Sequence, residues 1–297
     1  MKKILKISGL ILTFTTIALF LTGCKSNSEK HPDKIKVATS TNFYGEPAKA
    51  ILGDHGTVTS IVNSGTDPHE FTPKNSDAKA VSDANVVVEN GLDYDEWMSK
   101  LTSNSSDDLD VINVGKVMNK KDGDNEHIWY DPETMDKVAD KLVASYSKLQ
   151  PENKKEFEKN AANYKKEWKK TRDLVTKLSQ NGDNKKVDVS EPVFNYSLEA
   201  MGYKINNESY ANAVEKDVDP SPKALAQVKE DIKGRKIAFF VENTQTKNKT
   251  VDSLVKLAEE NDVPVVKVTE TVPAGTNYFD WMNSQYKQIE KIQAENK

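Results

Sequence analysis

Cysteine, histidine and arginine are scarce in this chain. Among its 297 residues there are one cysteine and four histidines. The lone cysteine excludes an internal disulfide, so no cross-link within the chain stabilises its fold. Arginine occurs only as Arg172 and Arg235. Sites for sugars and amino acids usually use aromatic stacking or a bidentate arginine, so this shortage argues against both ligand classes.

An excess of positive charge is also missing. The chain has 42 lysine and arginine residues against 46 aspartate and glutamate residues. Without Lys2, Lys3 and Lys6 the balance is 39 against 46, a formal charge of −7. A surface of this sign disfavours nucleic acid, and we expect no nucleic-acid partner. It is compatible with a cationic ligand but does not specify one.

The chain has no uncharged run long enough to cross a bilayer. Residues 7–21 carry no charge and follow Lys2, Lys3 and Lys6. A membrane-spanning helix needs about 20 apolar residues, whereas this run has the length of a signal-peptide core. We therefore expect residues 1–23 to be a signal peptide.

The signal ends in Leu21-Thr22-Gly23-Cys24, which resembles a bacterial lipobox. In a lipobox the cysteine is lipid-modified and becomes the new N-terminus; the alternative is an ordinary secretory signal that contains a cysteine. Residues 24–33 are polar, as expected of a tether. Stable anchoring takes more than one acyl chain. We expect an extracytoplasmic protein, anchored to the cell membrane through Cys24.

The remainder alternates β-branched runs with helical patterns, which is typical of α/β folds with largely parallel sheets. The expected strands are 35–38, 57–62, 86–89, 111–114, 187–189, 236–241 and 265–268. The expected shorter helices are 47–50, 76–83, 132–149, 194–201, 222–232 and 250–260. This order predicts two lobes, each with a mainly parallel sheet flanked by helices.

One long helix is predicted between the two series. Its apolar residues recur at spacings of three, four and seven, which places them on one helical face; they are Phe157, Ala161, Tyr164, Trp168, Val175 and Leu178. A coiled coil is the alternative, but the pattern is short for one. We expect residues 34–150 to form the N-terminal lobe, 151–181 a rigid linking helix, and 182–297 the C-terminal lobe.

Two of the four histidines have settings that suggest a function. His31 lies in the tether and His55 in a turn-like stretch, so neither is a strong candidate. His69 follows a predicted strand and is flanked by prolines, at the sheet edge where α/β folds bind ligands. His127 precedes Ile128-Trp129-Tyr130, and the two aromatic rings of this stretch could shield a site from water. Imidazole is the commonest protein ligand of transition metals. We expect neither His69 nor His127 to anchor the core.

The stretches around these histidines resemble a known family, the metal-binding proteins of ABC importers for zinc and manganese (cluster A-I or cluster 9). Asp67-Pro68-His69-Glu70-Phe71-Thr72-Pro73 looks like its first-ligand motif, and Asn125-Glu126-His127-Ile128-Trp129-Tyr130-Asp131-Pro132 looks like its second. The resemblance covers nearly all of the chain beyond Cys24. It implies a monomeric solute-binding lipoprotein that passes a metal ion to a membrane permease.

The resemblance also implies two ligands from the C-terminal lobe. Glu191 stands at the third position and Glu270 at the fourth, while Glu242 is a candidate for a supporting group beside the ligands. The chain departs from the zinc-type pattern, because it has no histidine at the third position and no histidine-rich run before His127. Two imidazoles and two carboxylates suit a divalent cation. Manganese and zinc both remain open, with a slight preference for manganese.

The sequence is compatible with two other functions. His69-Glu70-Phe71-Thr72-Pro73 begins like the H-E-x-x-H motif of zinc hydrolases, but its fifth residue is proline and the segment is not helical. Four protein ligands would also leave little room for the open position that a catalytic zinc needs. We therefore expect no enzyme. A surface adhesin is the second alternative, and metal-dependent stabilisation would distinguish it from a metal carrier.

Overall fold

The computed structural model describes residues 32–64, 71–103, 105–106, 108–246 and 248–295. The expected signal peptide, Cys24 and His69 lie outside the described residues. Within these ranges, no helix has both the length and the hydropathy required to span a membrane.

The first half of the chain builds a four-stranded parallel sheet. Its strands lie in the order β2-β1-β3-β4. All four residues of β3 are buried, as expected for a sheet covered on both faces. The elements are β1 (Ile35–Thr41), α1 (Asn42–Leu52), η1 (Gly53–His55), β2 (Gly56–Val62), α2 (Asn75–Ser82), β3 (Val86–Glu89), α3 (Glu96–Thr102), β4 (Asp110–Asn113), α4 (Val114–Val117), η2 (Ile128–Tyr130) and α5 (Thr134–Leu149).

The second half repeats this plan. Its strands are also parallel and lie in the order β6-β5-β7-β8. The elements are β5 (Lys186–Val189), η4 (Pro192–Phe194), α7 (Asn195–Ala200), β6 (Lys204–Ile205), α8 (Glu208–Glu215), α9 (Pro222–Lys233), β7 (Phe240–Asn243), α10 (Lys249–Glu260), β8 (Val265–Val268) and α11 (Tyr278–Glu295).

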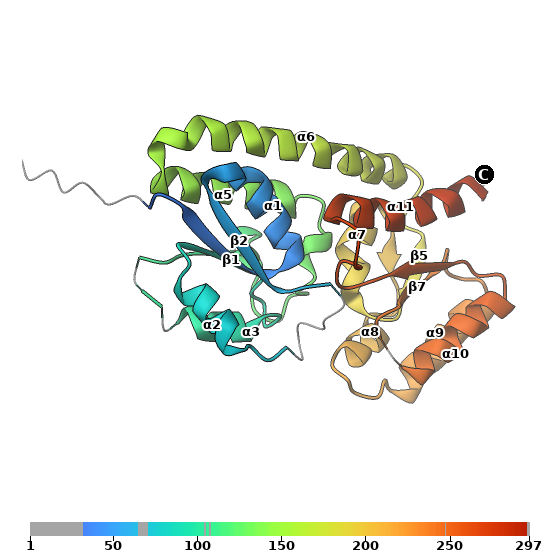
Figure 1. Ribbon diagram of the computed structural model, residues 1–297. Coiled ribbons are helices and arrows are strands. Elements are labelled where there is room, and N and C mark those ends of the chain that lie inside the picture. The colour runs from blue at the N-terminus through green and yellow to red at the C-terminus, as the bar shows by residue number, and fades with distance from the viewer. Residues whose placement is uncertain (1–31, 65–70, 104, 107, 247, 296–297) are drawn as a thin grey trace, which may run out of the picture. The chain divides into compact units, whose positions relative to one another are not determined.

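A single long helix connects the two sheets. The turn η3 (Pro151–Asn153) leads into α6 (Lys154–Ser179), which continues without interruption for 26 residues. All six apolar residues predicted to share one face are buried. They pack α6 against α1 and α5 at one end and against α7 and α11 further along (Figure 1). The predicted fold class, two parallel sheets with flanking helices and one long connecting helix, is confirmed.

Some boundaries differ from the expectation. The strand predicted at 236–241 begins only at Phe240, because Lys236 N is still bonded to Asp231 O in the turn that ends α9. The helix predicted at 47–50 extends over the whole of α1, despite Pro47. Helices α3, α4, α8 and α11 and the two-residue strand β6 were not predicted.

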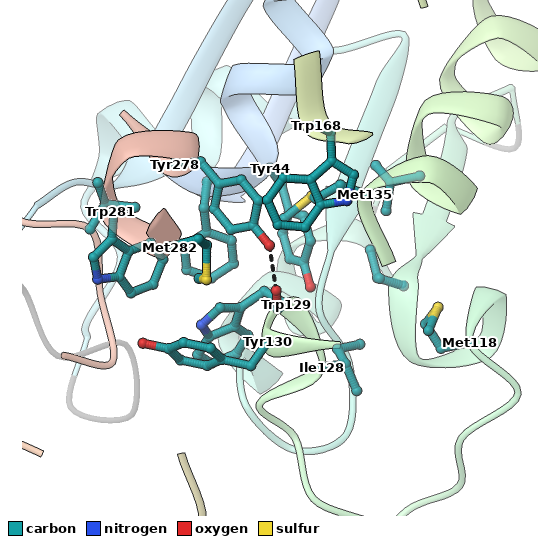
Figure 2. Packing of buried hydrophobic residues seen from close by; sticks show 14 of the residues in the cluster. Tyr44, Met118, Ile128, Trp129, Tyr130, Met135, Trp168, Tyr278, Trp281 and Met282 are labelled. Atoms are coloured by element: carbon teal, nitrogen blue, oxygen red, sulfur yellow. Dashed lines mark hydrogen bonds between the residues drawn. The ribbon is translucent and has the colours of Figure 1, made fainter. Parts of the chain in front are cut away.

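A shared core joins the loop after His127 to the second half of the chain. Trp129 and Tyr130 pack with Trp281 and other residues of one hydrophobic cluster (Figure 2). The Tyr278 hydroxyl donates a hydrogen bond to Trp129 O, and the Tyr130 hydroxyl donates to Gln285 Oε1 at 2.9 Å. This loop is therefore fixed by α11, although it precedes α6 in sequence.

Candidate metal centre

The topology of the C-terminal sheet creates a binding edge. The chain passes from β5 to β6 on one side and then to β7 on the other, so the connections diverge between β5 and β7. Open α/β sheets bind ligands beyond the carboxyl ends of the strands at such a point. Glu191 follows β5, Asn243 ends β7, and Glu270 follows β8. These three side chains therefore start from one edge of one sheet.

His127 comes from the first half of the chain and is completely buried. Its ring Nδ1 lies 2.8 Å from Asn125 Oδ1, while Asn125 Nδ2 donates to Pro192 O at 2.8 Å. The second bond fixes the orientation of the amide, because only the amide nitrogen can donate to a carbonyl oxygen. Nδ1 must then carry the hydrogen. Nε2 is left with a lone pair, which is the form of imidazole that binds metals.

Aromatic rings surround this imidazole. The ring centroid of His127 lies 5.1 Å from that of Trp129 and 6.2 Å from that of Tyr94. Such rings exclude water and strengthen electrostatic interactions at Nε2. The complete burial of His127 against Trp129 and Tyr94 counts against the expectation that its ring plays no part in the core.

Glu191 is held by two donors from the end of β7 and the loop that follows. Asn243 Nδ2 donates to Glu191 Oε2 at 2.7 Å, and the Thr246 hydroxyl donates to the same oxygen. Only 9% of Glu191 is exposed. A buried carboxylate needs such donors to offset its desolvation, and here they also fix the direction in which it points.

Glu270 is placed by its backbone and by a tyrosine from the other half of the chain. Its backbone N donates to Gln245 Oε1 at 2.6 Å. The pKa of the Tyr94 hydroxyl is raised well above its ordinary value. Burial is the largest cause, followed by the negative charge of Glu270 and a hydrogen bond with Glu270. Glu270 therefore faces Tyr94, one of the residues packed against His127.

Glu242 has a different environment from its neighbour Asn243. Glu242 is paired with Lys267 across the β7–β8 ladder, and Lys267 Nζ lies 3.8 Å from Glu242 Oε2. Successive side chains of a strand point to opposite faces of the sheet. In the structure it is Asn243 that contacts Glu191.

A further carboxylate, from α8, lies at the centre. Glu215 Oε1 is 3.6 Å from His127 Nε2. Glu126, His127 and Glu215 each offer one ligand atom, and these three atoms all lie within 4.8 Å of one another. The pKa of Glu215 is raised far above its ordinary value. Burial is the largest cause, followed by the negative charges of Glu126, Glu270 and Glu191. The carboxylates of Glu126, Glu191 and Glu270 are therefore close enough to Glu215 for their charges to act on it.

Several of these residues carry no signal in the sequence that points to the site. Asn125 and Glu126 stand in the second motif but were given no role at the site. Glu215 lies in no motif, and Asn243 and Thr246 are polar residues of a common kind. Of the predicted ligands, the structure brings His127, Glu191 and Glu270 to the surroundings of Glu215, and His69 lies outside the described residues. Buried imidazole nitrogen together with carboxylate oxygens is a donor set that fits a divalent transition metal.

Comparison with known proteins agrees with this chemistry. The chain is 29% identical to the manganese-binding lipoprotein MntA of Halalkalibacterium halodurans over 78% of its length and 80% of the relative's. It is 26% identical to the manganese ABC transporter substrate-binding lipoprotein PsaA of Streptococcus pneumoniae, over 86% of this chain and 93% of that one.

The fold is shared with a solved structure, the periplasmic zinc-binding protein TroA from Treponema pallidum. The TM-score is 0.73 at 18% identity, covering 88% of this chain and 99% of the other. The family profile described as "ZnuA: Zinc-uptake complex component A periplasmic" matches residues 37–292. The chain belongs to this ZnuA family of periplasmic zinc-uptake components.

Proposed function

We propose that this protein captures a divalent transition-metal cation outside the cytoplasm and delivers it to the membrane permease of an ABC importer. The observation that carries the proposal is the meeting of His127 Nε2, from the first half of the chain, with carboxylates from the second half. Two relatives named for manganese binding support it, one of them named as an ABC transporter component.

The proposed ligands are His69, His127, Glu191 and Glu270. Two neutral imidazoles and two carboxylates give a site charge of about −2, which balances a divalent cation. Mn²⁺ and Zn²⁺ both remain candidates, because the relatives and the family are named for different metals. In this proposal residues 34–150 and 182–297 each supply two ligands, and residues 151–181 connect them.

We propose that the protein is a monomer anchored to the cell membrane. Residues 1–23 would be removed, Cys24 would carry the lipid, and residues 24–33 would form the tether. The family is named for metal uptake, so the metal is cargo and we propose no catalysed reaction for it.

Metal-dependent thermal unfolding tests the function. A ligand that binds only the folded state stabilises it by about 4 kcal/mol at about a thousandfold excess over Kd. We expect MnCl₂, ZnCl₂ or both to raise the Tm of the full-length chain, measured against the same protein in chelator. His127→Gln, which keeps a side chain of similar length, should lose most of that rise.

His55→Gln is the matched control. His55 Nε2 lies 3.0 Å from Glu156 Oε2 on α6, in a different environment from His127. This variant should keep the full metal-induced shift. Equal shifts in all three proteins would contradict the site, and no shift with either metal would contradict the function. Elemental analysis after growth with equal zinc and manganese would then identify the cargo.

A further inference from the structure

An acidic pocket lies beside the proposed centre. Its volume is about 560 Å³, and residues from both halves of the chain line it. Its carboxylates are Asp93, Asp124, Glu126, Glu199, Glu208 and Glu215, whereas its lysines are Lys120 and Lys216. A concave lining with this excess of negative charge concentrates cations. Glu126 and Glu215 belong both to this pocket and to the surroundings of His127, and Glu215 is the one of the two that comes from the C-terminal half.

The core of the C-terminal half sets the position of Glu215. It is the last residue of α8, whose buried face consists of Tyr210, Ala211 and Val214. Residues four apart share a helical face, so Glu215 lies directly beyond Ala211. Tyr210 and Val214 pack into a hydrophobic cluster with residues of α9 and α10. The packing of α8 therefore fixes the backbone position from which Glu215 reaches His127.

The spacing between Glu215 and His127 suits two ligands of one ion. Their 3.6 Å separation is too long for a hydrogen bond. Two atoms that each lie about 2.1 Å from one ion are roughly 3–4 Å apart. The 12% exposure of the Glu215 side chain leaves it accessible from the pocket while most of it is buried.

We propose that Glu215 is an additional oxygen ligand of the captured cation, and that it shifts the preference of the site towards Mn²⁺ over Zn²⁺. The inference rests on the proposed function. A tetrahedral zinc site is complete with four ligands, whereas manganese accepts a larger, oxygen-rich shell. A carboxylate beyond the four proposed ligands therefore contributes more to Mn²⁺ binding than to Zn²⁺ binding.

The test measures Mn²⁺ and Zn²⁺ affinities of the full-length chain by competition with a chromophoric chelator. Glu215→Gln preserves the shape of the side chain and removes its charge. We expect it to weaken Mn²⁺ binding by about tenfold or more and Zn²⁺ binding by a clearly smaller factor. Glu259→Gln, an exposed position in the last turn of α10, should leave both affinities unchanged.

A second variant separates direct binding from a general effect of charge. Glu215→Asp keeps the charge but withdraws the carboxylate by one methylene. A direct ligand predicts weaker Mn²⁺ binding in this variant too, whereas retention of wild-type affinity would overturn the proposal. Melting in chelator confirms that each variant is folded.

The two proposals fail in different ways. If the wild type binds metal through His127 but Glu215→Gln binds Mn²⁺ as tightly as the wild type, or loses both metals equally, only this inference is overturned. If the wild type binds neither metal, the proposed function itself is overturned.

Discussion

Asn125 accepts two hydrogen bonds from His127 on one side-chain oxygen, from the backbone N at 2.9 Å and from the ring Nδ1 at 2.8 Å. Its amide nitrogen is bonded to Pro192 O, in the other half of the chain. One side chain thus sets the tautomer of the imidazole, its direction and its distance from the C-terminal sheet.

The first prediction concerns this orientation. Asn125→Ala should weaken metal binding by about 10- to 100-fold, as is usual when the partner of a ligating histidine is removed. Asn212→Ala is the control. Asn212 is exposed and lines the acidic pocket, as Asn125 does, and this variant should bind metal as the wild type does. Calorimetric titration with the preferred metal makes the comparison. Equal affinities in the two variants would show that Asn125 does not orient the ligand.

The second prediction concerns the support of Glu191. Thr246→Val keeps the side-chain shape but removes the hydroxyl that donates to Glu191 Oε2. We expect metal affinity to fall by about tenfold, because the carboxylate loses one of the contacts that aim it. Thr276→Val, at an exposed position, should have no effect. The idea fails if both valine variants bind metal equally well.

The third prediction concerns pH and a carboxyl group below the site. Burial is the main cause that raises the pKa of Asp188 from 3.8 to about 7; the charge of Asp231 adds to it, and a hydrogen bond from Asn206 opposes it. Between these pH values the folded state binds more protons than the unfolded state. The free energy of unfolding should therefore fall as pH rises from about 4 to about 7, by up to about 1.4 kcal/mol per unit of pKa difference, and stay level above that.

Asp188→Asn should remove this slope. The variant should match the wild type near pH 4 and be more stable at pH 8, where the wild type carries a buried charge. Urea unfolding at pH 4, 5, 6, 7 and 8 measures it, with the exposed Asp219→Asn as control. Parallel curves for Asp188→Asn and the wild type would contradict the prediction.

The fourth prediction concerns the bond between the loop of His127 and α11. The Tyr130 hydroxyl has two acceptors within hydrogen-bond distance, Gln285 Oε1 and Thr269 O. Tyr130→Phe should lower the free energy of unfolding by about 1 kcal/mol, because a buried hydrogen bond is lost while Gln285 Oε1 keeps the bond from Thr269 N. Among the described residues the buried Tyr210 hydroxyl has no hydrogen-bond partner. Tyr210→Phe should therefore be close to neutral in the same denaturation assay, and similar losses in both variants would argue against a special role for Tyr130.

Local patterns were sufficient for much of the fold. The buried face of α6 could be predicted because its apolar side chains recur with the helical period along a helix of 26 residues. Strands such as β3 were readable because a sheet buried on both faces selects continuous apolar runs. Helix α11 shows why other elements were missed, since its buried face includes the polar Gln285, which interrupts the apolar pattern.

The site was less accessible to sequence reasoning. His127, Glu191 and Glu270 were named from their motifs, but nothing in the motifs indicates how they are supported. Glu215 is brought to His127 by the packing of an eight-residue helix, and the two lie 88 positions apart in sequence. Such a contact depends on tertiary structure alone.

The attachment of Tyr130 to α11 has a consequence for recombination between relatives. A chimera joined within α6 would take the Trp129–Tyr130 loop from one parent and Tyr278 and Gln285 from the other. The loop that follows His127 would then pack against an α11 from the other parent, whose side chains need not match it. To keep these contacts within one parent, an exchange must move the C-terminal sheet and α11 together with the loop from Asn125 to Asp131, two stretches of chain that a single crossover cannot transfer.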